Sequence, residues 1–404
     1  MRLSNNLMYQ NGTDKILENQ QRVADAQERV NTGKKYLSSS EAPAIISQAM
    51  LFNDKIQINE QHVKNSEMLK SRLETQEGVL ESIKESVDRA NILTIKAGNG
   101  AMSDIDRKSM AGEIESIKEA VFSWMNAKSE NGRYIFSGYQ DNAQTYSFNS
   151  NTNTYEYNGD QGQHRIKVAD GVEIKSSDNG YEVFEKAQKR LNIERSSVTP
   201  AGADVYVGEQ PIFDRFHQDN YNADPNAAAN ANLITVNFTS ATDYDLLQGG
   251  VTIQSGTYSG SNLSISGLDI DVPNTVPGSI SFELEEPKKE NLLNSLNKLS
   301  VALSDNSLSN ADFKEVLSNT LVGLTNSKNL ISQTQASLGA RFNTADRIAS
   351  SNLTSDINNK QAKAKLIEVD MAEAISDLTK QESSLQASQA TFGRLANLSL
   401  FDYL

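Results

Sequence analysis

Apolar residues recur every seven positions near both ends of the chain, and this spacing constrains the fold more than any other feature. Side chains seven apart share one stripe of an α-helix. A stripe this narrow does not stabilise a lone helix, so we expect helices from the two ends to pair as a coiled-coil-like rod. The two series are Tyr9, Ile16, Val23, Val30 and Leu37, then Leu317, Leu324, Ile331, Leu338 and Ala345.

The zone before residue 139 contains two further helical stretches. A seam of Leu69, Leu73, Leu80, Ile83, Val87 and Ala90 predicts a long second helix, which Gly98 and Gly100 end. Ser103 or Asp104 could then cap a third helix. Its predicted apolar stripe is Met110, Ile114, Ile117, Val121 and Trp124.

Residues 139–287 have a different pattern. They hold six of the chain's seven prolines, and short alternating runs such as NLITVNF and SISFELEEP are separated by turn residues, as in β-strands. The stretch YNGDQGQHRIKV predicts a hairpin whose connection starts at Asn158 and Gly159. The fold class expected is therefore mainly α with an inserted β-rich domain, on an elongated rod of long N- and C-terminal helices. The predicted domains are 1–45 with 360–404, then 46–138 with 288–359, and finally 139–287.

Charge and composition exclude several classes of partner. The chain has 38 Lys and Arg against 52 Asp and Glu, a net charge of −14, which disfavours nucleic acid and anionic membranes as partners. There is no cysteine and no apolar run long enough to span a membrane. The start, MRLSNNLMYQNG, has no apolar segment typical of a cleaved secretory signal, so we expect either cytoplasmic residence or export by another route.

A search for catalytic or ligand-binding chemistry finds no convincing set. His62, His164 and His217 have no metal-ligand spacing, and no nucleophile elbow or P-loop is present. The stretch NSNTNTYEYNGD lacks the opening Asp and central Gly of a calcium loop, so a turn is the better interpretation. We expect no catalytic residue, no metal and no cofactor.

Several stretches, in order along both helical zones, resemble the flagellin family, and most of all its branch at the hook-filament junction. The residues Phe136, Ser137 and Gly138 in NGRYIFSGY point to that branch. In the turn after Gly33-Lys34, Pro43 is in place but Ser40-Glu41 stand where the family usually has two acids. The other matching stretches are Leu3-Ser4-Asn5-Asn6, AGNGAMSDIDR, Leu338-Gly339-Ala340-Arg341, Val369-Asp370-Met371-Ala372-Glu373-Ala374 and the final LSLFDYL.

The resemblance implies a structural role outside the cell. Family members leave the cell through the flagellar type III apparatus and assemble with copies of themselves in a helical ring, with terminal helices forming an inner tube. The junction branch lies between the first hook-associated protein and flagellin. An export chaperone is expected to bind the C-terminal helix before assembly. The resemblance therefore implies a secreted, extracellular part of the bacterial flagellum that is not an enzyme.

The last ten residues, LANLSLFDYL, are rich in large apolar side chains and contain a single charged residue, although chain termini usually fray into water. Buried apolar side chains stabilise by roughly 1.5 to 3 kcal/mol each, and one partner helix covers only one stripe. We therefore expect both ends to fold fully only on assembly. The candidate assembly residues are Leu3, Leu7, Ile16, Val23, Val30, Met371, Ile375, Leu378, Leu385, Phe392, Leu395, Leu398, Leu400 and Phe401, and the family-motif turns contain Gly33, Pro43, Gly98, Asn99, Gly100, Phe136, Ser137 and Gly138.

Two alternatives stay open at this point. The chain could be flagellin itself, a filament subunit, although the short insertion and the FSG stretch argue against this. It could also be a secreted binding module in which a clustered aromatic face of the β domain recognises a glycan or protein.

Overall fold

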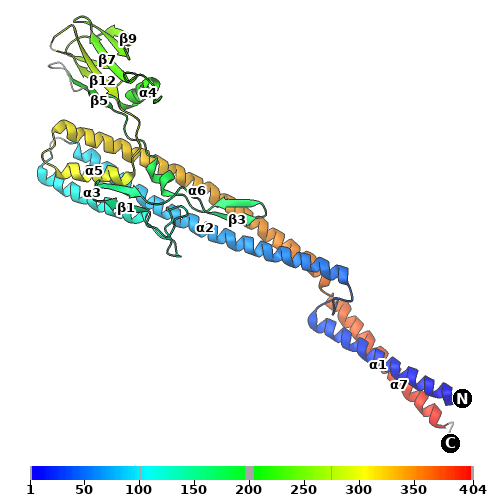
Figure 1. Cartoon of the computed structure of the whole chain (residues 1–404). Helices are drawn as coiled ribbons and strands as arrows, with labels where there is room; N and C mark the ends of the chain where they lie inside the picture. Colours follow the sequence, from blue (N-terminus) through cyan, green and yellow to red (C-terminus); the bar gives the residue numbers. More distant parts are fainter. Residues whose placement is uncertain (1, 100–101, 196–203, 274, 402–404) are drawn as a thin grey trace. The chain divides into compact units, whose positions relative to one another are not determined.

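The computed structural model describes residues 2–99, 102–195, 204–273 and 275–401, without the side chains of residues 2–6, 195 and 395–401. The elements follow the chain as drawn in Figure 1. The helices are α1 Arg2–Thr32, α2 Pro43–Ala97, α3 Asp104–Met125, α4 Gln210–Asn220, α5 Leu292–Ser304, α6 Asn310–Ile367 and α7 Met371–Phe401, with a π-helical turn at Tyr181–Glu185. The strands are β1 Tyr146–Asn149, β2 Thr154–Tyr157, β3 Arg165–Ala169, β4 Val172–Lys175, β5 Ile193–Arg195, β6 Asp204–Val207, β7 Leu233–Phe238, β8 Asp243–Gln248, β9 Val251–Thr257, β10 Asn262–Ile265, β11 Leu268–Asp271 and β12 Gly278–Leu284.

This element order confirms the predicted fold class of long helices at both ends with strands between them. The chain divides into two compact units. One comprises Met1–Ser71, Arg165–Ile174 and Arg341–Leu404, and the other comprises Arg72–His164 and Lys175–Ala340. The predicted domain boundaries, drawn from composition, stay a prediction.

The first unit contains α1, α7, the first half of α2, the last half of α6 and the β3–β4 hairpin. Side-chain amides fix this hairpin on the two long helices: Asn65 of α2 donates to the Lys167 carbonyl at 2.7 Å, and Asn352 of α6 donates to the Val168 carbonyl at 2.8 Å. Val168 is fully buried in this position. The hairpin is thus held by the burial of Val168 and by two side-chain hydrogen bonds, of which the one from Asn352 is buried.

In the second unit, α2, α3, α5 and α6 contribute buried apolar stripes, and the predicted seams supply most of them. Along α2 and α6 the side chains seven apart are at most 5% exposed. Lys328 of α6 and Asp88 of α2 form an ion pair across the two helices at 2.5 Å. The buried seam residues are Leu73, Leu80, Ile83, Val87 and Ala90 on α2, Leu317, Leu324, Ile331 and Leu338 on α6, and Leu292, Leu296, Leu299 and Leu303 on α5.

The predicted stripe of α3 is only half right. Ile114 and Val121 are buried, but Met110, Ile117 and Trp124 are only partly covered. The true stripe is rotated by about one residue and includes Lys118, whose ammonium donates to Asn297 Oδ1 at 2.9 Å. The apolar pattern of the sequence could not predict Lys118 at this position, because a lysine does not count as an apolar residue.

The strands between the helical zones form four separate antiparallel sheets. β5 to β12 contribute a five-stranded sheet in the order β5-β12-β7-β8-β9 and a three-stranded sheet in the order β10-β11-β6. In β7, alternate residues are buried, as the period of a half-buried strand requires. A core of buried residues joins the two sheets to α4: Ile193, Val205, Phe213, Ile234, Val236, Phe238, Tyr244, Leu246, Tyr258, Leu263, Ile265, Leu268, Ile270, Ile280, Phe282 and Leu284.

The hairpin predicted over YNGDQGQHRIKV is wrong. β2 pairs with β1 and β3 pairs with β4, so the two strands that this stretch contributes belong to different sheets. The physical reason lies in Asp160, whose carboxylate accepts backbone N–H groups of Tyr139 at 2.8 Å and Gly162 at 2.7 Å. These two hydrogen bonds stabilise a longer connection here instead of a two-residue hairpin turn.

Candidate assembly surfaces

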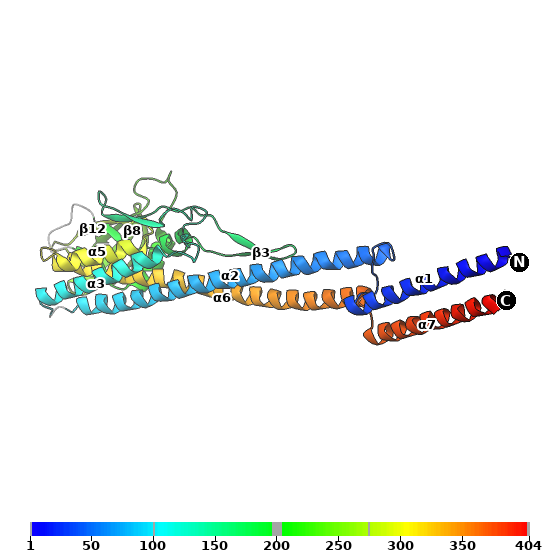
Figure 2. The same cartoon turned by 90° about the horizontal axis from the view of Figure 1, so that it is seen from below.

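Helices α1 and α7 pair side by side, with the first residues of α1 and the last residues of α7 at the same end of the pair (Figures 1 and 2). The Tyr9 ring meets the edge of the Phe392 ring at a centroid distance of 5.8 Å. Further along α1, Asn19 Nδ2 donates to Ser388 Oγ at 2.6 Å. The residue number in these contacts rises along α1 while it falls along α7, so the two helices are antiparallel.

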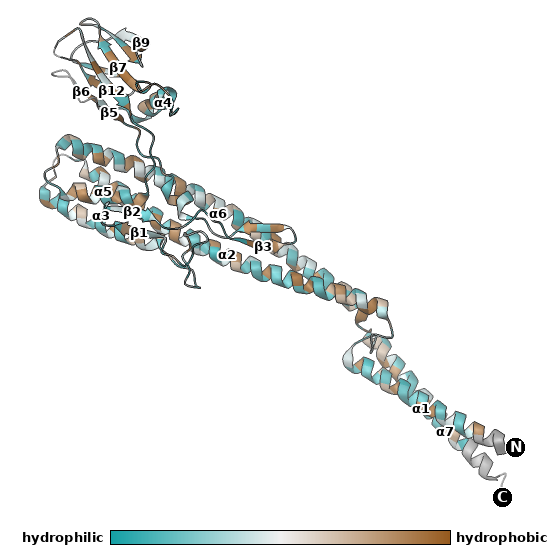
Figure 3. Cartoon of the chain, viewed as in Figure 1, coloured by the Kyte–Doolittle hydropathy of each residue, from teal (hydrophilic) through white to brown (hydrophobic). Residues whose placement is uncertain are grey.

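The seam between these helices is thin. On α1 the seven-residue series of Tyr9, Ile16 and Val23 alternates with a second series of Gly12, Asn19 and Ala26. At Gly12 the helices approach so closely that an added Cβ would lie 2.7 Å from Phe392 Cδ2. Hydrophobic positions are scattered along both helices in Figure 3. A seam of small residues excludes little apolar surface from water.

Burial confirms how little this pair encloses. Among the side chains that the structure describes, Ala26 of α1 and Ala374 of α7 are buried, whereas Leu80 and Leu324 of the other long helices are fully enclosed. The apolar series on α1 and α7 is therefore only half covered within a single copy of the chain.

The structure places the predicted assembly residues in three groups. Ile16, Val23, Val30, Leu378, Leu385 and Phe392 are half-buried in the seam. Leu7, Met371 and Ile375 are exposed at 60%, 46% and 51%. The side chains of Leu3, Leu395, Leu398, Leu400 and Phe401 lie outside the described part of the chain.

The sequence prediction missed the second series on α1. The missed residues, Gly12, Asn19 and Ala26, are small or polar, but their own seven-residue spacing was a usable signal.

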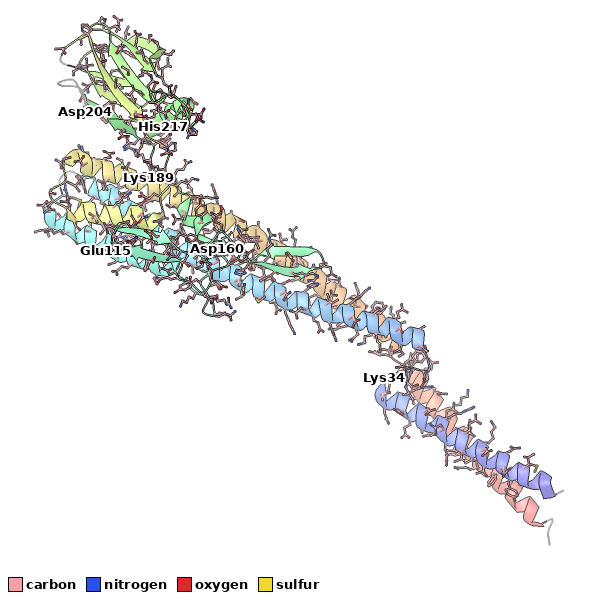
Figure 4. The ribbon with its side chains drawn as sticks, in the orientation of Figure 1. Lys34, Glu115, Asp160, Lys189, Asp204 and His217 are labelled. Carbon is pink, nitrogen blue, oxygen red and sulfur yellow. The ribbon has the colours of Figure 1, made fainter. Side chains whose placement is uncertain are left out.

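The first family-motif turn connects α1 to α2. Gly33 has φ +66°, a left-handed conformation that suits glycine after a helix end, and its N–H donates to the Arg29 carbonyl at 2.9 Å. Lys34, labelled in Figure 4, forms a β-bridge with Glu368 next to the α6–α7 connection. Pro43 is the first residue of α2, where its missing N–H costs nothing.

The second motif turn separates α2 from α3. Gly98 and Asn99 continue hydrogen bonds to the last turn of α2, and Gly100 lies outside the described residues. Ser103 is the N-cap of α3 and forms a capping box with Asp106, which resolves the two cap candidates.

The third motif, Phe136-Ser137-Gly138, is buried. The Phe136 ring packs 5.2 Å from that of Phe184, and Ser137 Oγ lies 2.8 Å from Thr145 Oγ1. Gly138 has φ +70°, and an added Cβ would lie 2.1 Å from Oδ1 of Asp160, a residue marked in Figure 4. This motif therefore fixes a packed loop.

The hydroxyl of Tyr157 completes that loop by donating to the carbonyls of Phe136 at 3.0 Å and Asp160 at 2.7 Å. Burial raises the pKa of Tyr157 to about 12, so the hydroxyl keeps its proton at neutral pH.

The histidines lie in three separate settings. His62 is buried on α2, His164 is partly exposed before β3, and His217 is buried on α4, where its Nε2 lies 2.8 Å from the Glu285 carbonyl oxygen. Over the described residues no group of His, Cys, Asp and Glu has the arrangement of a metal site. No described helix is both long and apolar enough to cross a bilayer.

The aromatic residues of the β5–β12 region are mostly in its core. Phe213, Phe238, Phe282, Tyr244 and Tyr258 are buried there. This burial removes most of the aromatic side chains that a binding face would need.

Comparison with known proteins gives one match to the N-terminal helical zone and one along nearly the whole chain. Residues 3–141 match the N-terminal helical region of bacterial flagellin. Flagellar hook-associated protein 3 of Escherichia coli is 24% identical over 401 residues, which cover 99% of each chain. The chain is thus similar to a flagellar hook-associated protein 3 along its whole length and to flagellin in its N-terminal helical region. Flagellar hook-associated protein 3 of Salmonella typhimurium is 30% identical over 143 residues, 35% of this chain and 45% of that protein.

The solved flagellar junction protein of Legionella pneumophila shares the fold of this chain. The TM-score is 0.58 at 21% identity, and the match covers 80% of this chain and 99% of that one. The resemblance read from the sequence motifs is thereby confirmed.

Proposed function

We propose that this chain is a structural subunit of the bacterial flagellum that assembles as a short ring at the hook-filament junction. Two findings support the proposal. The chain is similar along 99% of its length to a flagellar hook-associated protein 3, and its fold is that of a flagellar junction protein.

The observation that carries the assembly role is the half-covered α1–α7 seam. A single copy leaves Leu7, Met371 and Ile375 exposed and encloses few described side chains of either helix. Contacts with neighbouring copies would cover these side chains, and the hydrophobic effect would then stabilise the pair in the assembly. Terminal helices whose contacts are incomplete in a single copy are what a subunit of a tube requires.

The partners proposed are further copies of the chain, the first hook-associated protein on the hook side and flagellin on the filament side. An export chaperone would cover the apolar C-terminal helix before assembly. The location proposed is extracellular, as part of the flagellum, and the role needs no catalytic activity.

Removal of Leu395 to Leu404 tests the proposal. In a strain of the source bacterium that lacks the wild-type copy, we expect the truncated chain to be absent from hook ends and filaments to detach, as seen by immunogold electron microscopy. The double substitution Leu398→Asp with Leu400→Asp should have the same effect. The matched control is Ser383→Asp with Gln386→Asp, two exposed positions of the same helix with the same added charge. Normal filaments on the truncated chain would contradict the proposal.

Flagellin itself is the second candidate function, because the matched N-terminal region is that of flagellin. In cells that lack their own flagellin, a filament subunit would form long filaments when overproduced. A junction subunit would form only a short ring, which is the result we expect.

A further inference from the structure

A groove of about 760 Å³ runs between α3, α5 and the β1–β2 hairpin. Its lining combines aromatic and aliphatic side chains with carboxylates. Phe148 is 45% and Val301 is 51% exposed, although both are large and apolar. Glu115, labelled on α3 in Figure 4, lies in the same lining. A surface of this kind loses apolar exposure when a partner covers it.

The charges in the groove are unevenly paired. The one lysine in the lining, Lys118, is satisfied internally, since its ammonium lies 2.8 Å from Glu115 Oε1 and 2.9 Å from Asn297 Oδ1. Glu119 is exposed and forms no ion pair among the described residues. The groove therefore presents an unpaired carboxylate beside apolar side chains, which favours a partner with a cation beside apolar side chains.

The last turns of α2 carry that combination. Ile92 and Ile95 are 47% and 65% exposed. Lys96 follows, also exposed and without an ion-pair partner in the described part of the chain. Residues at i, i+3 and i+4 lie on one face of a helix, so these three side chains form a compact projection, which we call the α2 knob.

The α2 knob and the groove cannot meet within one copy of the chain. Arg89 of α2 and Glu113 of α3 form an ion pair at 2.5 Å, which sets the register of the two helices. The two helices are antiparallel, so in this register Glu119 of α3 lies opposite Ile83 of α2. Ile83 is 13 residues before Lys96 on α2, and a helix of that length spans ~20 Å. A different copy must supply the knob.

We propose that the α2 knob of one copy docks in the α3–α5 groove of the next copy, with Lys96 facing Glu119. The two surfaces differ, so the contact is heterologous and generates a ring or helix of copies instead of a closed dimer. The inference rests on the proposed function, because a ring supplies the neighbouring copy. Charge complementarity identifies a second copy of this chain as the occupant.

Charge reversal tests the contact in the full-length chain. Lys96→Glu and Glu119→Lys each place like charges together and should weaken each contact by roughly fivefold, which reduces the fraction of hooks that carry filaments. The double variant exchanges the two charges and should restore that fraction. The control pair is Glu286→Lys with Lys288→Glu, both exposed and outside both surfaces. If the double variant is as defective as the singles or worse, the occupant is another protein and the proposal fails.

Crosslinking gives a second, independent readout, because the chain contains no cysteine. Chains carrying both Lys96→Cys and Glu119→Cys should form a ladder of dimers, trimers and larger species with a bismaleimide shorter than the ~20 Å separation within one copy. A mixture of the two single-cysteine chains should form dimers only, and either chain alone should form none.

The outcomes separate this inference from the proposed function. A chain that is present at hook ends and carries filaments, yet gives no ladder and tolerates both charge reversals, overturns the knob-and-groove contact alone. A wild-type chain that is absent from hook ends overturns the proposed function.

Discussion

Replacing Leu324 with alanine should destabilise the chain far more than replacing Leu385 with alanine. Leu324 of α6 is fully buried, whereas Leu385 of α7 is half-buried in the thin seam with α1. Full burial of a leucine contributes about 1.5 to 3 kcal/mol, and the cavity left behind raises the cost of Leu324→Ala to about 3 to 5 kcal/mol. Leu385→Ala opens no enclosed cavity, so we expect about 1 kcal/mol or less.

Urea denaturation of the free chain, followed by far-UV circular dichroism, measures both changes in the free energy of unfolding. Leu338→Ala, also in the buried seam of α6, serves as a second core variant and should behave like Leu324→Ala. If Leu385→Ala costs as much as Leu324→Ala, the α1–α7 pair is well packed in a single copy, and the reasoning from its thin seam is refuted.

Three further predictions concern local features. Gly138→Ala combines a left-handed φ of +70° with an overlap on Asp160, so it should lower stability by at least about 1 to 2 kcal/mol; an unchanged melting temperature would contradict this. Ser103→Ala removes the capping box of α3 and should cost about 1 kcal/mol in urea unfolding, whereas Ser116→Ala, an exposed site within the same helix, should be nearly neutral. Burial lowers the pKa of His217 below 6.5, so this imidazole binds a proton more readily in the unfolded chain than in the folded one. The free energy of unfolding should therefore fall as the pH drops below about 6.5. In thermal melts, His217→Gln should make the melting temperature less dependent on pH in this range.

The buried seams of α2 and α6 could be predicted because large apolar residues form most of each seam. Leu80 and Leu324 stand in unbroken series at helical spacing, and no partner is needed to recognise them. The strand character of residues such as Ile234 and Phe238 followed in the same way from alternation and turn residues.

Features that depend on distant partners could not be predicted. Lys118 is buried because Asn297 and Glu115 satisfy its ammonium, and Asn297 belongs to a helix far along the chain. The connection between β2 and β3 is held by Asp160, whose role appears only once Tyr139 and Gly162 are close to it.

In the candidate assembly surface, too, only the residues with a clear apolar spacing could be predicted. The half-buried series of Ile16 and Val23 was visible as apolar spacing. The second series, with Gly12 and Ala26, has the same seven-residue spacing but only a weak hydrophobic signal, because its residues are small or polar. Their effect appears only in the close approach to Phe392.

Hydrogen exchange of the chain, free and assembled, tests most directly the claim that the terminal helices are completed by neighbouring copies. In the free chain we expect fast amide exchange over Arg2–Thr32 and Met371–Phe401 and slow exchange over the buried half of α2 from Leu69 to Ala97, because local opening is easiest where little apolar surface is enclosed. On assembly the two terminal helices should become protected. Slow exchange at both ends of the free chain would contradict the account, since it would mean that a single copy already holds α1 and α7 together.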